Sequence, residues 1–79
     1  MTTTEKVTNA VSERTGRKPS EILPDTDVRG ELGMDSLDAV ELMMELEDEF
    51  GISIPSEKSA ELKTVTEIAE LIDSLKAAQ

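Results

Sequence analysis

Residues 31–55 decide the fold, and their sequence is ELGMDSLDAVELMMELEDEFGISIP. Apolar residues recur every three or four positions from Ser36 to Phe50, which is the period of an α-helix. Asp35 is a residue type that caps helix N-termini, and Gly51 is the type that follows helix C-termini. The stretch therefore predicts a helix from about residue 36 to residue 50.

A second helix is expected over residues 3–15, because Thr2 and Glu5 have the spacing of a capping box and Gly16 supplies a stop. Residues 17–34 form a long connection that prolines and glycines interrupt. Connections of this length are often functional. Four apolar residues are expected to pin the connection to the core: Ile22, Leu23, Val28 and Leu32.

The last helix is expected over residues 65–77, where Thr64 and Glu67 again have capping-box spacing. A short helix over residues 56–62 is expected after Pro55. These elements predict an all-α fold, a small up-and-down bundle of three main helices plus one short helix.

The chain has 79 residues, which supports a single domain over residues 1–79. It has no Cys and no His, so thiol nucleophiles, Ser-His-Asp catalysis and the usual zinc sites are excluded. No apolar run is long enough for a membrane span. We therefore expect a cytoplasmic, monomeric protein that is not an enzyme and has no metal site.

The charge is strongly negative and unevenly distributed. The net charge is −10, which disfavours contact with nucleic acid or with anionic membranes. No basic residue lies between Arg29 and Lys58, and half of the acids lie in that window. A cluster of this kind, without counter-charge, steers basic protein partners to the predicted central helix.

The predicted central helix has two apolar faces. With Ser36 at zero on a helical wheel, five apolar residues fall between roughly 240° and 340° and are expected to face the core. These are Ala39, Leu42, Met43, Leu46 and Phe50. Leu37, Val40 and Met44 fall separately, at roughly 40° to 100°. An apolar patch with carboxylates around it is typical of a protein-binding surface.

Ser36 lies at the predicted helix start, where free backbone N–H groups and the helix dipole favour a phosphate. The chain offers no His or Cys as a base for Ser36, so this residue is not expected to act as a catalytic nucleophile. It is better interpreted as the acceptor of a group that another enzyme delivers.

The chain resembles the acyl carrier proteins of the phosphopantetheine-binding carrier family. The resemblance extends over essentially the whole chain and rests on matched segments. They are Leu32-Gly33-Met34-Asp35-Ser36-Leu37, then Asp38 and Val40-Glu41-Leu42, then Leu46-Glu47-Asp48-Glu49-Phe50, Ile54-Pro55 and Thr64-Val65. It implies a four-helix bundle with 4′-phosphopantetheine attached to Ser36, between Asp35 and Leu37. The thiol of this arm would carry acyl groups for fatty-acid or related lipid or polyketide biosynthesis.

The resemblance also implies the partners, which are a phosphopantetheinyl transferase and acyl-transferring or chain-elongating enzymes with basic patches. The implied partner surface comprises Leu37, Asp38, Val40, Glu41, Met44, Glu47 and Asp48. Seven core residues would line the space for a bound acyl chain: Leu42, Leu46, Phe50, Ile54, Val65, Ile68 and Ile72.

Two other functions stay open at this point. The first is a carrier of an aminoacyl, peptidyl or D-alanyl group, although the peptidyl type more often has a non-acidic residue where Asp35 stands. The second is an acidic interaction domain without a carrier role, in which Ser36 only begins a helix.

Overall fold

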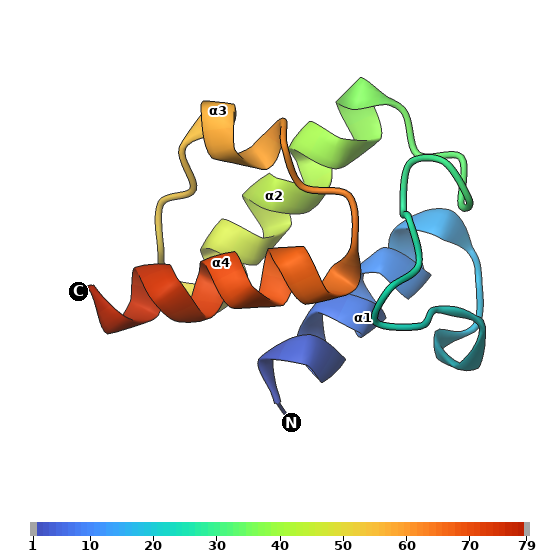
Figure 1. Ribbon diagram of the computed structural model, residues 1–79, viewed down its shortest axis with the longest axis horizontal. Helices are drawn as coiled ribbons and strands as arrows, with labels where there is room; N and C mark the ends of the chain where they lie inside the picture. The colour runs from blue at the N-terminus through green and yellow to red at the C-terminus, as the bar shows by residue number, and fades with distance from the viewer. Residues whose placement is uncertain (1, 79) are drawn as a thin grey trace.

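The three long helices begin and end at the residues that the sequence indicates. The computed structural model describes residues 2–78. Its elements are α1 (Thr3–Thr15), the 3-10 helix η1 (Pro19–Glu21), α2 (Ser36–Phe50), α3 (Ser56–Ser59) and α4 (Val65–Ala77), which Figure 1 shows in chain order. The predicted bounds of α1, α2 and α4 are confirmed.

Local hydrogen bonds explain these bounds. Thr2, Asp35 and Thr64 each form a capping box with the residue three positions later, as in the pair of bonds between Asp35 and Asp38. Such bonds satisfy N–H groups that a helix start leaves without partners. Gly51 ends α2 with φ 66°, and its N–H donates to the carbonyl of Glu47 at 2.8 Å. A left-handed residue at this position favours glycine.

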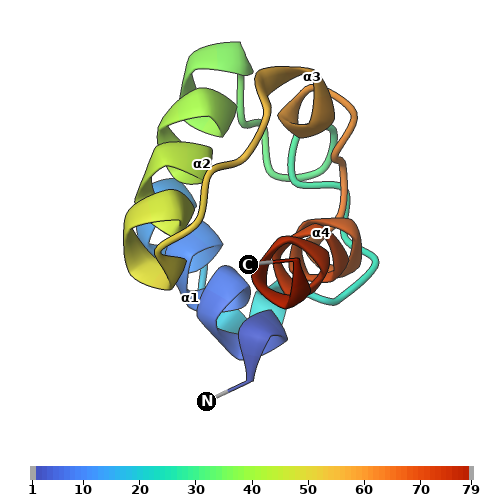
Figure 2. The ribbon, with the colours of Figure 1, turned by 90° about the vertical axis from the view of Figure 1, so that its left-hand side faces the viewer.

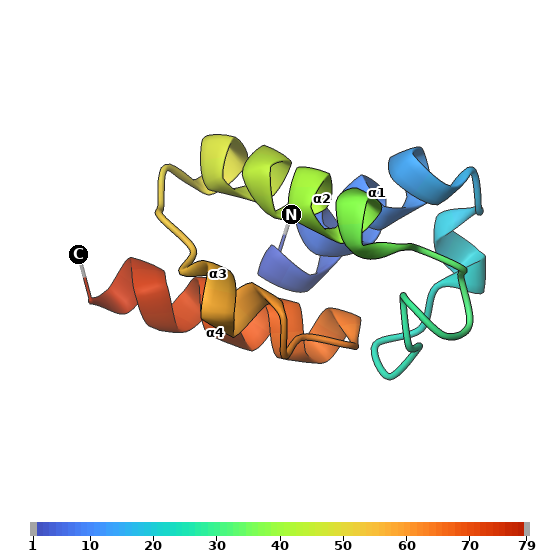
Figure 3. The ribbon, with the colours of Figure 1, turned by 90° about the horizontal axis from the view of Figure 1, so that it is seen from above.

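The helices surround one apolar core. In two perpendicular views α1 and α2 lie on one side of the molecule, and α3 and α4 lie on the other (Figures 2 and 3). Helix α1 packs against both α2 and α4. The most completely buried large side chains come from these three helices: Val7, Val11, Leu42, Leu46, Val65, Ile68 and Ile72. The predicted all-α bundle is confirmed, and among residues 2–78 only an isolated β-bridge occurs, between Asp27 and Thr64.

The long connection between α1 and α2 is attached to the start of α4. The Val28 N–H donates to the carbonyl of Lys63 at 2.8 Å, and the Thr66 N–H donates to the carbonyl of Pro24 at 3.0 Å. Three apolar side chains of this connection are buried, Ile22, Val28 and Met34. The connection is therefore part of the packed structure.

The prediction that Leu23 is buried is wrong, because its side chain is 58% exposed. Leu23 begins a tight turn in which its N–H donates to the Thr26 hydroxyl at 2.9 Å and its carbonyl accepts from the Thr26 N–H at 3.0 Å. The turn buries Thr26 and leaves Leu23 in solvent. Leu32, also predicted to contact the core, is partly buried against it.

The short helix is shorter than predicted. We expected residues 56–62, but α3 ends at Ser59. The N–H groups of Glu61 and Leu62 donate three residues back, to Lys58 and Ser59, so the chain tightens into a turn. Leu62 still packs against the core from this turn. None of the helices in the described part of the chain is long and apolar enough to cross a membrane.

Candidate functional site

The chain enters α2 through a tightly held turn. Gly33 adopts φ 73°, and Met34 buries its side chain in the core while its N–H donates to the carbonyl of Val28 at 3.3 Å. Asp35 then accepts a hydrogen bond from the Asp38 N–H at 2.9 Å, which fixes the direction of the first turn. The anchored Met34 and the cap at Asp35 hold Ser36, the first residue of α2, at the surface.

Ser36 is available for modification. Its side chain is exposed, and its hydroxyl has no hydrogen-bond partner among residues 2–78. The backbone N–H groups of Ser36 and Leu37 also lack acceptors within this part of the chain. An exposed hydroxyl beside free N–H groups at the positive end of a helix dipole is suited to a phosphodiester. The described residues contain no cluster of acids that would hold a metal ion.

An exposed apolar patch follows Ser36 along α2. Leu37 is 65% exposed, Val40 52% and Met44 59%. These three residues, called the α2 patch below, were predicted from the wheel to lie apart from the core, and the structure confirms this. Ala39, Leu42, Met43 and Leu46 of the same helix are buried. Helix α2 therefore presents one apolar face to the core and a smaller one to solvent.

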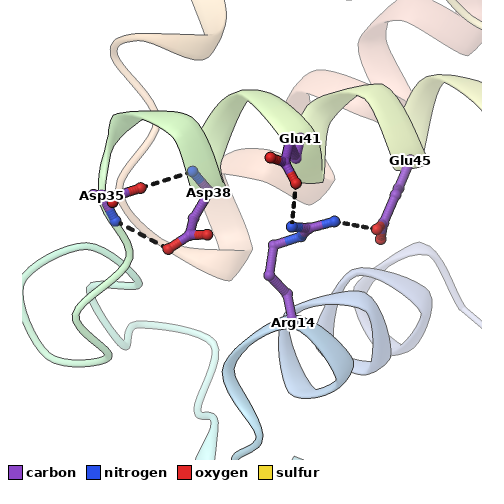
Figure 4. A network of polar contacts seen from close by, with 5 residues as sticks. All are labelled: Arg14, Asp35, Asp38, Glu41 and Glu45. Atoms are coloured by element: carbon purple, nitrogen blue, oxygen red, sulfur yellow. Dashed lines mark hydrogen bonds and ion pairs between the residues drawn. The ribbon is translucent and has the colours of Figure 1, made fainter.

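Three acids of α2 have counter-charges that the local sequence did not indicate. Arg14, in the last turn of α1, pairs with Glu41 at 2.9 Å and also with Glu45 (Figure 4). Lys6 of α1 lies 3.9 Å from Glu49. The expectation of an acidic cluster without counter-charge is therefore wrong for Glu41, Glu45 and Glu49, because α1 supplies their cations across the helix interface.

Two other acids near the patch, Asp38 and Glu47, have structural partners. Asp38 closes the capping box with Asp35. Glu47 accepts a hydrogen bond from the Ile54 N–H at 2.6 Å, which holds the segment after α2. Asp48 is exposed and makes no hydrogen bond or ion pair among the described residues. The predicted partner acids are thus close to the patch along α2. They differ in whether they form hydrogen bonds or ion pairs within the protein.

Electrostatics strengthen the Arg14 contact. The hydrogen bond to Glu45 raises the pKa of the Arg14 guanidinium, and Glu41 acts in the same direction, while desolvation opposes both. The Arg14 side chain is 17% exposed. Its two terminal nitrogens each donate to one carboxylate, and its Nε atom is buried without a hydrogen-bond partner in the described structure.

The residues predicted to line an acyl-chain space are found together in the core. Leu42, Leu46, Ile54, Val65, Ile68 and Ile72 are all buried in one cluster. Phe50 lies at the margin of this cluster, half-buried, with the ammonium groups of Lys6 and Lys76 each 5.3 Å from its ring centre. A hollow of about 270 Å³ lies elsewhere, between α1 and α2, and Leu46 is the one predicted residue that lines it.

Fold and site define a class of protein, a small helical bundle with a surface serine at the start of its second long helix. The family model described as the phosphopantetheine attachment site matches residues 5–72. The chain belongs to this family of acyl carrier proteins, and phosphopantetheine is its cofactor. The family consists of carriers that work with transferases and biosynthetic enzymes.

Particular relatives agree with this assignment. The chain is 40% identical over 74 residues to the acyl carrier protein of Thermosynechococcus vestitus, a match that covers 94% of this chain and 91% of that protein. It is also similar to the structure of the acyl carrier protein from Enterococcus faecalis, with a TM-score of 0.81 and 28% identity. That match covers 95% of this chain and 99% of the other.

Proposed function

We propose that the chain carries acyl groups as thioesters on 4′-phosphopantetheine attached to Ser36, for enzymes of fatty-acid or related lipid or polyketide biosynthesis. The observation that carries the proposal is the position of Ser36. It is the exposed first residue of α2, inside the matched family region and directly before the α2 patch. The bound group supplies a terminal thiol, which a chain without Cys does not have.

The role of Ser36 in loading is that of an acceptor. In the proposed step a transferase forms a bond between Ser36 Oγ and the β-phosphorus of coenzyme A. The pyrophosphate bond of coenzyme A breaks, adenosine 3′,5′-bisphosphate leaves, and a base of the transferase takes the hydroxyl proton. The start of α2 contributes the free N–H groups of Ser36 and Leu37, which stabilise the phosphodiester charge.

We further propose that partner enzymes dock on the α2 patch and the acids beside it. Leu37, Val40 and Met44 supply apolar contact, and Asp38, Glu41, Glu47 and Asp48 attract basic residues. A carrier must leave each enzyme after transfer, so weak and fast contact steered by charge suits it. The cytoplasmic location stays a prediction, as does the single carrier domain over residues 1–79.

Replacement of Ser36 tests the attachment site. The protein is incubated with coenzyme A and a broad-specificity phosphopantetheinyl transferase, and its intact mass is measured. We expect a gain of one phosphopantetheine unit in the wild type and no gain in Ser36→Ala. Because Ser36 is exposed and its side chain makes no hydrogen bond in residues 2–78, the substitution changes stability by only about 0.5 kcal/mol.

Ser56→Ala is the matched control, since Ser56 is also the exposed first residue of a helix. It is expected to load like the wild type. Loading of a folded Ser36→Ala variant would show that phosphopantetheine is attached to another residue. Absence of loading in a folded, unmodified wild-type sample would contradict the carrier function.

Replacement of Met44 tests the partner surface. Met44→Glu places a carboxylate in the middle of the α2 patch, where partner contact would bury it without a counter-charge. We expect the variant to accept phosphopantetheine to completion but to lower kcat/KM of an acyl transferase about tenfold, the size of one interface contact. Initial rates of acyl transfer at several carrier concentrations measure this.

Leu23→Glu is the control, because Leu23 is equally exposed but lies in the connection before α2. It makes the same chemical change outside the patch and is expected to leave the transfer rate unchanged. Equal rates for Met44→Glu and the wild type would remove the α2 patch from the proposed interface.

A further inference from the structure

Arg14 joins α1 to the acidic side of α2 through two carboxylates. Its Nη1 donates to Glu41 Oε2 at 2.9 Å, and its Nη2 donates to Glu45 Oε1 (Figure 4). Glu41 and Glu45 lie one helical turn apart, so one guanidinium spans two successive turns of α2. The planar fork of arginine suits such a pair of acceptors, which the single ammonium of lysine does not match.

Glu41 differs in this respect from the other acids of the proposed partner surface. Asp38 and Glu47 accept from backbone N–H groups, and Asp48 is free of hydrogen bonds and ion pairs within residues 2–78. Glu41 is the member of this group that a cation of the same chain holds. Its side chain is still 46% exposed, so an incoming basic residue can reach it.

A basic residue of a partner that approaches Glu41 meets a carboxylate whose charge Arg14 already compensates in part, because Glu45 shares the same guanidinium. It must displace Arg14 or share the carboxylate, and either way the attraction is smaller than at an unpaired acid. We propose that Arg14 is a competing cation that weakens docking of basic partners at Glu41 and so determines which partners the α2 surface selects. Partners whose cations contact Asp48 but not Glu41 are unaffected. This inference rests on the proposed carrier function.

The test measures kcat/KM for loading by a phosphopantetheinyl transferase with coenzyme A, over a series of NaCl concentrations. Arg14→Gln is expected to raise kcat/KM about two- to fivefold and to steepen its fall with salt, because changes in peripheral charge alter association rate and salt dependence. Arg17→Gln is the matched control. It makes the same charge change on an exposed arginine that pairs with Glu21 of η1 and not with an acid of α2.

A double-mutant cycle with Glu41 separates competition from a structural effect. Glu41→Gln is expected to have little effect in the wild type and to remove most of the gain in the Arg14→Gln background. A merely structural role of Arg14 would give equal effects of Glu41→Gln in both backgrounds. Arg14→Lys keeps the charge but loses the two-carboxylate fork, and it is expected to give part of the rise in kcat/KM. It replaces Arg14→Gln in the test if that variant unfolds.

Two outcomes overturn the inference alone: equal kcat/KM for Arg14→Gln and Arg17→Gln, or an equal effect of Glu41→Gln in both backgrounds. In either case wild-type loading remains, and with it the carrier function. Absence of loading in the folded wild-type protein overturns the proposed function and the inference together. Circular dichroism melts confirm that every variant is folded at the assay temperature.

Discussion

Asp35 and Ser36 are neighbours at the start of α2, yet the structure uses them differently. The Asp35 carboxylate accepts from the Asp38 N–H, and its own N–H points to the Asp38 carboxylate in the reciprocal bond. Asp35 was expected beside the cofactor, and its observed contacts are those of a helix cap. Ser36 makes no side-chain hydrogen bond in the described chain, so its hydroxyl is free at the surface, as the proposed attachment requires.

Glu67 is a residue whose ionisation supports the fold. Its Oε1 accepts from the N–H groups of Lys63 and Thr64, both at 3.0 Å. These two hydrogen bonds lower the pKa of Glu67 from its ordinary value of 4.5. A group with a lowered pKa in the folded state stabilises the fold above its ordinary pKa, and this contribution is lost as the pH falls through the lowered value.

Glu67→Gln is therefore expected to lower the melting temperature near neutral pH. The difference from the wild type should shrink as the pH falls below about 4.5, since the wild-type carboxyl then becomes protonated. Melting curves at several pH values measure it. Glu70→Gln, the same change at an exposed position of α4, is the control. A difference that does not change with pH would contradict this role.

At the scale of the element, α2 has two apolar faces, one buried and one exposed to solvent. Its buried face, with Leu42 and Leu46, holds the bundle together, while Leu37, Val40 and Met44 stay in solvent. Surface exposure of three large apolar residues on one helix has no benefit for folding. The division is possible because side chains three or four positions apart share a face.

The end of α2 depends on the backbone of Gly51. An alanine Cβ at this position would meet no atom within 4 Å, so the cost of a side chain comes from φ 66° alone. Gly51→Ala is expected to destabilise the protein by about 1 to 2 kcal/mol, measured by urea unfolding. Gly51→Asn is the matched variant and should cost less, because asparagine tolerates the left-handed region. Equal losses for the two variants would contradict the backbone explanation.

At the scale of the whole molecule, the core is aliphatic. The fully buried large side chains are Leu, Ile and Val, and the single Phe of the chain lies at the margin between Lys6 and Lys76. Aliphatic cores tolerate repacking when the total apolar volume and pattern are kept. On this basis we propose that a bound acyl chain enters among the residues that the resemblance implies: Leu42, Leu46, Phe50, Ile54, Val65, Ile68 and Ile72.

Nuclear magnetic resonance tests that proposal. A long acyl chain loaded on Ser36 is expected to shift the methyl resonances of buried core residues such as Leu46 and Ile72. An acetyl group on the same arm is the control, since it is too short to fill an apolar space. Unchanged core resonances with the long chain would contradict the proposed acyl space. Shifts confined to Lys6, Asn9 and Glu13 would place the chain in the hollow between α1 and α2 instead.

The helix bounds were predictable because their causes are local. A capping box joins residues three positions apart, and a glycine in the left-handed region ends a helix by its own backbone preference. The separation of the α2 patch from the core face was predictable for the same reason, since helical periodicity alone divides the two. The sequence by itself therefore determined the bundle, the surface position of Ser36 and the family motif around it.

Only the tertiary structure decided which charges and side chains meet across elements. Arg14 is 27 residues from Glu41 and 31 from Glu45, and no local pattern predicts that pairing. The burial of Met34 and the exposure of Leu23 likewise depend on how the long connection attaches to the start of α4. Such contacts result from the packing of whole helices, which brings distant residues together only after the local structure has formed.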